Sequence, residues 1–281
     1  MTPQIPIEQF EIAATGLDHP ECVAVDRGGG LWAGGEAGQV YRIESNGNVN
    51  EVAKLGSFNG GIAFSPDDEL FVCNPTLGIV NVKRSGEHMV FATHAGEHRL
   101  LTPNFGVFDR AGNYYVTDSG QWKKQNGFIL RFDAGGRGEV VAGPFGYANG
   151  LALSADGRRL FMAETNTNRV YRFDVAGDGS LGEAQVLTEG VGRMVDGLAL
   201  DAAGHLYACC YASDEIWRID GGGEKTLLAW DPNAILLGAP TNMAFAGDEM
   251  SDLYVANLGR YTITRVRLGQ RGQPLANQRE G

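Results

Sequence analysis

The chain has 281 residues, and its 43% hydrophobic and 20% charged residues are the balance of an ordinary soluble globular protein. A formal net charge of −11 and the lack of any dense Lys/Arg run exclude nucleic acid as a partner. No apolar run approaches the roughly 20 residues of a membrane span, and the first ten residues do not resemble a signal peptide, so we expect a cytoplasmic protein without a membrane partner.

One short unit recurs six times, beginning near residues 21, 60, 104, 149, 196 and 241. The clearest pair reads N-G-L-A-L-S from Asn149 and D-G-L-A-L-D from Asp196. A turn and then an apolar strand follow each start, and several units add an aromatic-bearing strand. Successive starts lie 39, 44, 45, 47 and 45 residues apart, a spacing typical of propeller blades.

The units predict an all-β fold, a six-bladed β-propeller with four-stranded antiparallel blades, as a single domain over residues 1–281. The sixth unit offers only three strands, the last over Thr262–Arg267. The stretch Gln9–Ala14, ahead of the first unit, is expected to supply the missing outer strand. Such an N-terminal strand in the last blade would close the ring and remove an exposed sheet edge.

Six residues occupy the start of the innermost strands, and the fold would bring them together around one mouth of the channel: Glu21, Gly60, Asn104, Asn149, Asp196 and Thr241. Converging carboxylates are costly to desolvate without a partner, and their oxygens, like those of amides, suit a divalent cation. With few protein ligands, positions remain for water or substrate. Turn capping is the alternative, because Asn and Asp often precede Gly in turns.

Over essentially its whole length the chain resembles the gluconolactonase family that includes regucalcin, the senescence marker protein. The resemblance rests on His19-Pro20-Glu21, Pro103-Asn104, and the two units that begin at Asn149 and Asp196. It implies that Glu21, Asn149 and Asp196 ligate one divalent metal. It also implies that Asp196 is the general base and that Asn104 lies beside the metal, against water or substrate. Calcium is the first choice, with Zn²⁺, Mn²⁺ and Mg²⁺ as alternatives.

The sequence departs from the family at two places that bear on substrate. Thr102 stands where sugar-lactonase members often carry an Arg, and Pro20-Glu21-Cys22 replaces the usual Glu-Gly-Pro. A less polar lactone is therefore as good a candidate as a sugar-acid lactone.

Two further places offer candidate substrate contacts. The loop of residues 119–127 offers Trp122 as an apolar wall and Lys123 or Lys124 as a positive charge, unless it is a solvated hairpin. His19 is a candidate at the mouth, with turn structure as its alternative. His94 and His98 are four residues apart, but Gly96 between them and the surrounding β repeat speak against a metal pair.

The sequence therefore predicts a metal-dependent lactonase that opens a small lactone or related ester at the channel mouth, as a monomer or weak homo-oligomer. A propeller that binds calcium or another ligand without turnover is one alternative. Dehydration or isomerisation of a hydroxylated acid at the same metal is the other. No Gly-x-Ser-x-Gly elbow supports serine chemistry. No Cys-x-x-Cys pair supports a thiolate metal site, and four reduced cysteines are expected.

Overall fold

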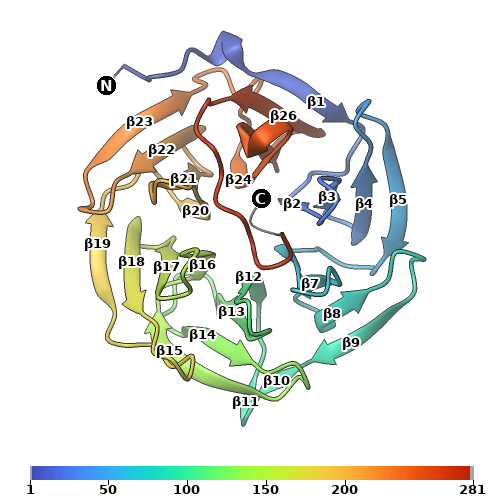
Figure 1. The fold of residues 1–281 in the computed structure, drawn as a ribbon, viewed down its shortest axis with the longest axis vertical. Helices are drawn as coiled ribbons and strands as arrows, with labels where there is room; N and C mark the ends of the chain where they lie inside the picture. Colours follow the sequence, from blue (N-terminus) through green and yellow to red (C-terminus); the bar gives the residue numbers. More distant parts are fainter. Residues whose placement is uncertain (1, 279–281) are drawn as a thin grey trace.

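A computed structural model describes residues 2–278, which form six four-stranded antiparallel sheets arranged around one axis (Figure 1). The innermost strands contact one another in a closed circle. The predicted six-bladed propeller is therefore confirmed. The expected domain, 1–281, includes residue 1 and residues 279–281, which lie outside the described residues.

Each of the first five blades is built from four consecutive strands. Blade 1 contains β2 Cys22–Val25, β3 Leu31–Gly34, β4 Gln39–Ile43 and β5 Val49–Lys54. Blade 2 contains β6 Ile62–Phe64, β7 Leu70–Asn74, β8 Gly78–Val82 and β9 His88–Ala92. Blade 3 contains β12 Pro103–Phe108, β13 Tyr114–Asp118, β14 Gly127–Phe132 and β15 Gly138–Phe145. Blade 4 contains β16 Ala148–Leu153, β17 Arg159–Glu164, β18 Arg169–Asp174 and β19 Gln185–Glu189. Blade 5 contains β20 Val195–Leu200, β21 Leu206–Cys210, β22 Glu215–Ile219 and β23 Lys225–Trp230.

Blade 6 joins the two ends of the chain. Its strands are β24 Pro240–Ala246, β25 Asp252–Asn257, β26 Thr262–Arg267 and the N-terminal β1 Glu11–Thr15. β1 pairs antiparallel with β26, with Glu11 opposite Arg265 and Thr15 opposite Thr262. The N-terminal strand thus closes the ring as predicted, although it begins two residues later than Gln9, which belongs to the 3-10 helix η1 Ile7–Gln9.

Little else interrupts the blades. A short hairpin of β10 His94–Ala95 and β11 His98–Arg99 lies between blades 2 and 3. The second 3-10 helix of the described part is η2 Asp248–Met250. Among residues 2–278 no helix is long and apolar enough to cross a membrane.

The hydrophobic core is a ring of six clusters, each between two neighbouring blades of the described chain. Trp32 of blade 1 meets Phe64 of blade 2 edge to face, with ring centroids 5.9 Å apart. On β21, Cys209 packs toward blade 6 and Cys210 toward blade 4, because successive strand residues point to opposite faces. All four cysteines are buried and free, as the sequence predicts.

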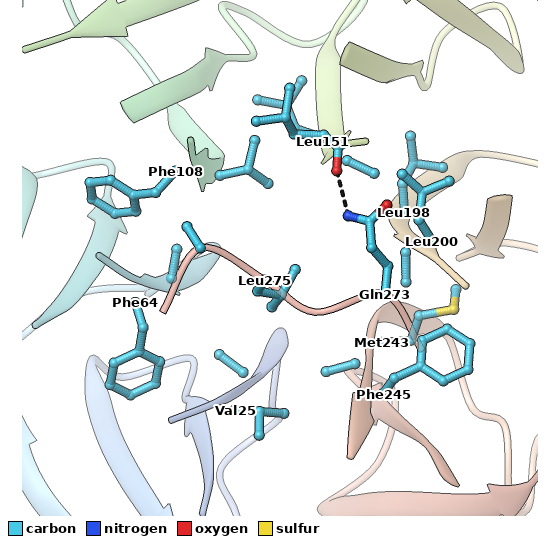
Figure 2. A pocket seen from close by; sticks show the side chains of 18 of the residues that line it. Val25, Phe64, Phe108, Leu151, Leu198, Leu200, Met243, Phe245, Gln273 and Leu275 are labelled. Atoms are coloured by element: carbon cyan, nitrogen blue, oxygen red, sulfur yellow. Dashed lines mark hydrogen bonds between the residues drawn. The ribbon is translucent and has the colours of Figure 1, made fainter. Parts of the chain in front are cut away.

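The tail that follows β26 crosses the end of the channel where the innermost strands finish (Figures 1 and 2). Gln273 Nε2 donates to the Leu153 carbonyl at 2.7 Å, and Gln273 N donates to the Leu200 carbonyl at 3.0 Å. Leu275 and neighbouring tail residues close an apolar cavity of about 100 Å³. The channel is therefore covered at this end, and the opposite end carries the predicted ring of polar residues.

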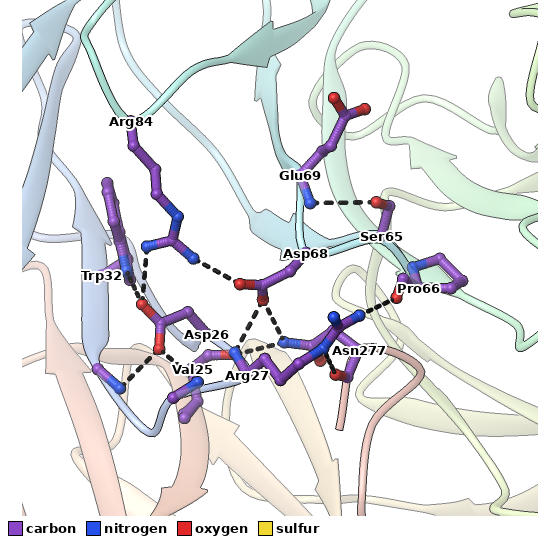
Figure 3. Close-up of polar contacts among 12 residues, drawn as sticks. Val25, Asp26, Arg27, Trp32, Ser65, Pro66, Asp68, Glu69, Arg84 and Asn277 are labelled. Atoms are coloured by element: carbon purple, nitrogen blue, oxygen red, sulfur yellow. Dashed lines mark hydrogen bonds and ion pairs between the residues drawn. The ribbon is translucent and has the colours of Figure 1, made fainter. Parts of the chain in front are cut away.

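A polar network ties blades 1 and 2 to this tail (Figure 3). The buried Asp26 Oδ2 accepts hydrogen bonds from Trp32 Nε1 at 3.0 Å and Arg84 Nη1 at 2.9 Å. Arg84 Nη2 also donates to Asp68 Oδ2 at 2.5 Å, and Asn277 Nδ2 donates to Asp68 Oδ1 at 3.2 Å. Because the network joins segments far apart in sequence, we expect it to stabilise the closed ring.

We expect Asp26→Ala to lower the free energy of unfolding by about 2–4 kcal/mol, because Trp32 Nε1 and Arg84 lose their acceptor. Thermal unfolding should show a Tm lower by roughly 4–16 °C. Asp133→Ala is the matched control, since the partly exposed Asp133 accepts the same i+2 and i+4 backbone hydrogen bonds as Asp26. Equal shifts in both variants would show that the turn, and not the network, carries the effect.

Candidate functional site

A solvent-open pocket of about 330 Å³ lies at the end of the channel where the innermost strands begin. Polar side chains from five blades line this pocket: Glu21 just before β2, Asn104 on β12, Asn149 on β16, Asp196 on β20 and Thr241 on β24. Five of the six ring positions inferred from the repeat thus bring side chains to one pocket. The pocket is therefore the structure's candidate functional site.

The sixth ring position, Gly60, contributes backbone rather than a side chain. A Cβ added there would lie 2.6 Å from the Asn104 carbonyl oxygen, closer than real contacts allow. The next residue, Gly61, donates its N–H to the same oxygen at 2.5 Å. A glycine at this position lets blade 2 approach the backbone that carries Asn104.

The two ring asparagines are held by the same arrangement of hydrogen bonds. Asn104 Nδ2 donates to Ser119 Oγ at 3.0 Å, and Ser119 Oγ donates to the Ala148 carbonyl at 2.7 Å. Asn149 Nδ2 donates to Thr165 Oγ1 at 3.1 Å, and that hydroxyl donates onward to a blade 5 carbonyl at 2.8 Å. Because each hydroxyl proton is already used, each hydroxyl must accept from the amide nitrogen. The amide oxygens are thereby left to act as acceptors or ligands.

Glu21 and Asp196 are both buried, each with 8% of its surface exposed. Burial and the nearby charge of Asp196 raise the pKa of Glu21 well above its ordinary value. Burial also raises the pKa of Asp196, against a smaller opposite effect of the Asn149 amide. Two desolvated carboxylates that repel each other are unfavourable in their ionised form unless a cation joins them.

The donor set fits a divalent cation. Glu21 Oε2 is buried and has no hydrogen-bond partner among the described residues. Two carboxylates and the Asn149 amide oxygen offer hard oxygen ligands of the kind that Ca²⁺, Mg²⁺ and Mn²⁺ prefer. A cation would satisfy the orphaned oxygen and offset the desolvation and repulsion that raise the pKa of Glu21.

Tyr147 is a pocket residue that the sequence did not reveal. Burial, followed by the charges of Asp196 and Glu21, raises the pKa of Tyr147 to about 12, so its hydroxyl stays protonated near the carboxylates. Tyr147 lies two residues before a ring position and has a left-handed backbone, φ +67°. Met194 and Ala239 also lie two residues before a ring position, and their φ values are +57° and +49°. Non-glycine residues adopt this conformation at a cost of about 1–2 kcal/mol. No sequence pattern marks it.

Two other predicted substrate contacts also line the pocket. Thr102 lies against it, while its Oγ1 donates to the Gly120 carbonyl at 3.0 Å and so anchors the loop of residues 119–127. Trp122 of that loop is 45% exposed and meets Tyr147 edge to face at 4.9 Å. The remaining lining is largely apolar and lacks any Lys or Arg: Phe58, Pro75, Pro103, Thr165, Met194, Tyr211 and Leu258.

His19 is not among the residues that line the pocket. Its Nδ1 lies 3.1 Å from both Asp18 Oδ1 and Glu36 Oε2, and its ring contacts Tyr261 at 4.5 Å. Asp18, His19 and Glu36 form a partly exposed group whose ligand atoms lie within 4.8 Å of one another. This group is separate from the ligand set expected from the sequence.

The histidine pair at 94 and 98 sits on the β10–β11 hairpin and does not belong to the pocket lining. His98 Nε2 lies 2.8 Å from Asp118 Oδ2, whereas His94 Nδ1 lies 2.9 Å from Thr93 Oγ1. The two rings thus have different hydrogen-bond partners.

The fold and the pocket together define a propeller with a concave pocket at one end of its channel, the kind of feature in which small molecules usually bind. Residues 19–258 match the family model described as SMP-30/Gluconolactonase/LRE-like region. The chain belongs to this family, and the resemblance noted in the sequence is confirmed.

Three relatives illustrate the family. The 6-deoxy-6-sulfogluconolactonase of Pseudomonas putida is 27% identical over 238 residues, covering 80% of this chain and 78% of the relative. Pentonolactonase XacC of Haloferax volcanii is 27% identical over 235 residues, covering 81% and 77%. A solved structure described as a calcium-binding protein, regucalcin, from Agrobacterium tumefaciens superposes with a TM-score of 0.79 at 19% identity, covering 97% of each chain.

Proposed function

We propose that this protein is a metal-dependent hydrolase that opens a small lactone at the pocket ringed by Glu21, Asn149 and Asp196. The observation that carries the proposal is the pair of buried carboxylates, one with an orphaned oxygen, in a pocket open to solvent. Family membership and the two lactonases among the relatives support lactone hydrolysis.

In this proposal Glu21, Asn149 and Asp196 hold one divalent cation, with calcium as the first choice because every donor is oxygen. The calcium-binding propeller among the relatives supports a divalent metal. When bound, such a cation supplies Lewis-acid polarisation of an ester carbonyl and lowers the pKa of nearby water. Its ligand set leaves room for small molecules on the open side of the pocket.

The chain's own residues would then move one proton and place the reactants. Asp196 accepts a proton from water as the water oxygen attacks the lactone carbonyl carbon. A ligating carboxylate is a weak base, so the lowered pKa of the water must supply part of the effect. The ring C–O bond then breaks, and Asp196 returns the proton to the departing ring oxygen. The product is an open hydroxy acid.

Asn104 and Tyr147 are suited to orienting roles. The Asn104 amide nitrogen donates its hydrogen bond to Ser119 Oγ, so the Asn104 amide oxygen can position the attacking water. The protonated Tyr147 hydroxyl can donate to a substrate oxygen. The apolar lining around Trp122 would contact the carbon face of the lactone ring and limit access of bulk water.

Purified protein, stripped with a chelator, tests the proposal against a panel of γ- and δ-lactones. We expect at least one lactone to be hydrolysed with Ca²⁺, Mn²⁺ or Zn²⁺ present. The activity should disappear on chelation because carbonyl polarisation and the lowered pKa of water are then lost. A pH-stat or indicator assay reports the released acid. If no lactone is hydrolysed with any divalent cation, the hypothesis of a propeller that binds a ligand without turnover would replace that of an enzyme. Conversion of hydroxylated acids with inert lactones would favour dehydration or isomerisation.

A further inference from the structure

A second hollow of about 470 Å³ adjoins the ring pocket. The two share Trp122, Thr165 and Met194 as lining residues. Thr165 also holds the Asn149 amide, so one residue contacts both the ring and the second hollow. A ligand bound at the ring could therefore extend into this hollow past Trp122 and Met194.

The second hollow carries the positive charge that the ring pocket lacks. Lys123 and Arg193 line it, whereas no Lys or Arg lines the ring pocket. Neither side chain makes an ion pair or hydrogen bond among the described residues, although acidic residues outnumber basic ones by 34 to 23. Both residues are exposed, and two unpaired cations that line one hollow of an acidic protein are suited to binding an anion.

The surrounding residues supply donors and a fixed loop. Asn168 Oδ1 accepts the Met194 N–H at 2.6 Å, which leaves the Asn168 amide nitrogen as a donor. Lys124 N donates to the Gln121 carbonyl at 3.0 Å, and this turn holds Lys123 in a left-handed conformation, φ +60°. Of the two lysines that the sequence offered in this loop, the structure places Lys123, and not Lys124, in the hollow.

We propose that the lactone carries an anionic substituent, a carboxylate, phosphate or sulfonate, which Lys123 and Arg193 bind while the ring lies at Asp196. The inference rests on the proposed function of the ring pocket. Arg193 can meet such a group with two parallel N–H donors, and Lys123 can meet it as a point charge. The substrate class is then an acid-bearing lactone of sugar size rather than a neutral apolar one.

Steady-state kinetics on three lactones of the same carbon skeleton test the proposal: glucono-δ-lactone, its 6-phosphate, and a glucarolactone with a terminal carboxylate. The wild type should prefer one of the anionic lactones. Lys123→Met and Arg193→Met should each raise its KM by about 10–100-fold, with a much smaller effect on the neutral lactone. Which anionic lactone responds separates phosphate from carboxylate recognition.

Lys124→Met is the matched control, because Lys124 is the adjacent lysine in the same loop but lies outside both linings. It should leave all three KM values unchanged. Equal losses on neutral and anionic lactones in Lys123→Met and Arg193→Met would show a structural role for the loop and overturn the inference. So would a wild type that does not distinguish the lactones.

A binding experiment separates failure of this inference from failure of the proposed function. Calorimetric titration with 6-phosphogluconate and glucarate, the open-chain acids, needs no turnover. Binding that is lost in Lys123→Met and Arg193→Met supports the anion site even if no lactone is hydrolysed. Absence of binding by the wild type, in a protein that hydrolyses neutral lactones, would overturn the anion site and leave the lactonase proposal intact.

Discussion

Replacing Asp196 by asparagine is expected to abolish both cation binding and lactone hydrolysis. The variant removes one of two buried carboxylates and the proposed base while keeping the side-chain shape. Loss of a general base alone lowers kcat by about 10²–10⁴-fold, and the weakened cation site adds to that loss. Calorimetric titration with Ca²⁺, Mn²⁺ and Zn²⁺, together with the lactone assay, measures the two effects.

Stability supplies a readout of the same variant that does not depend on activity. Without a cation, Asp196→Asn should unfold at a higher temperature than the wild type, because the cost of burying the Asp196 carboxylate beside Glu21 is gone. A saturating cation should stabilise only the wild type, by about 2.7 kcal/mol at 100 times Kd. Asp252→Asn, equally buried but outside the pocket, is the control. An Asp196→Asn protein that still binds and responds to cations would rule out this ligand set.

Asn104→Ala is expected to keep the cation and lose rate, whereas Asn149→Ala should lose the cation. The two substitutions remove the same amide from equivalent ring positions, each held by a hydroxyl of its own blade. Because Asn104 is assigned to orient water or substrate, kcat should fall by about 10–1000-fold with unchanged cation affinity. Single-turnover kinetics and calorimetric titration of both variants give the comparison.

The comparison of Asn104→Ala with Asn149→Ala also tests the roles assigned to the two residues. If Asn104→Ala loses cation binding as Asn149→Ala does, Asn104 is a cation ligand, and its assigned role of orienting water or substrate is wrong. If Asn104→Ala retains full rate on the best substrate, it has no role in the reaction. Ser119→Ala offers a milder test, because it frees the Asn104 amide without deleting it.

Much of this architecture could be predicted because each propeller blade is formed by one continuous stretch of sequence with its own pattern of strands and turns. Each blade needs short strands and tight turns, so the six units and their spacing could be recognised in the sequence. Closure by the N-terminal strand followed from the missing fourth strand after Thr262–Arg267. The polar ring could be predicted because the repeat aligns one position in every blade. Five of the six ring residues line the pocket with their side chains.

The repeat pattern was therefore enough to predict the blades, the closure and the residues that meet at the ring. Three features became visible only in the folded chain. Tyr147 lies near Asp196, and His19 contacts Asp18 and Glu36 instead of the pocket. Lys123, rather than Lys124, lines the second hollow. The physical reason is that strands repeat a pattern of burial, whereas the loops between them are placed by left-handed backbone conformations and contacts between distant segments. Such conformations and contacts leave no periodic trace in the sequence.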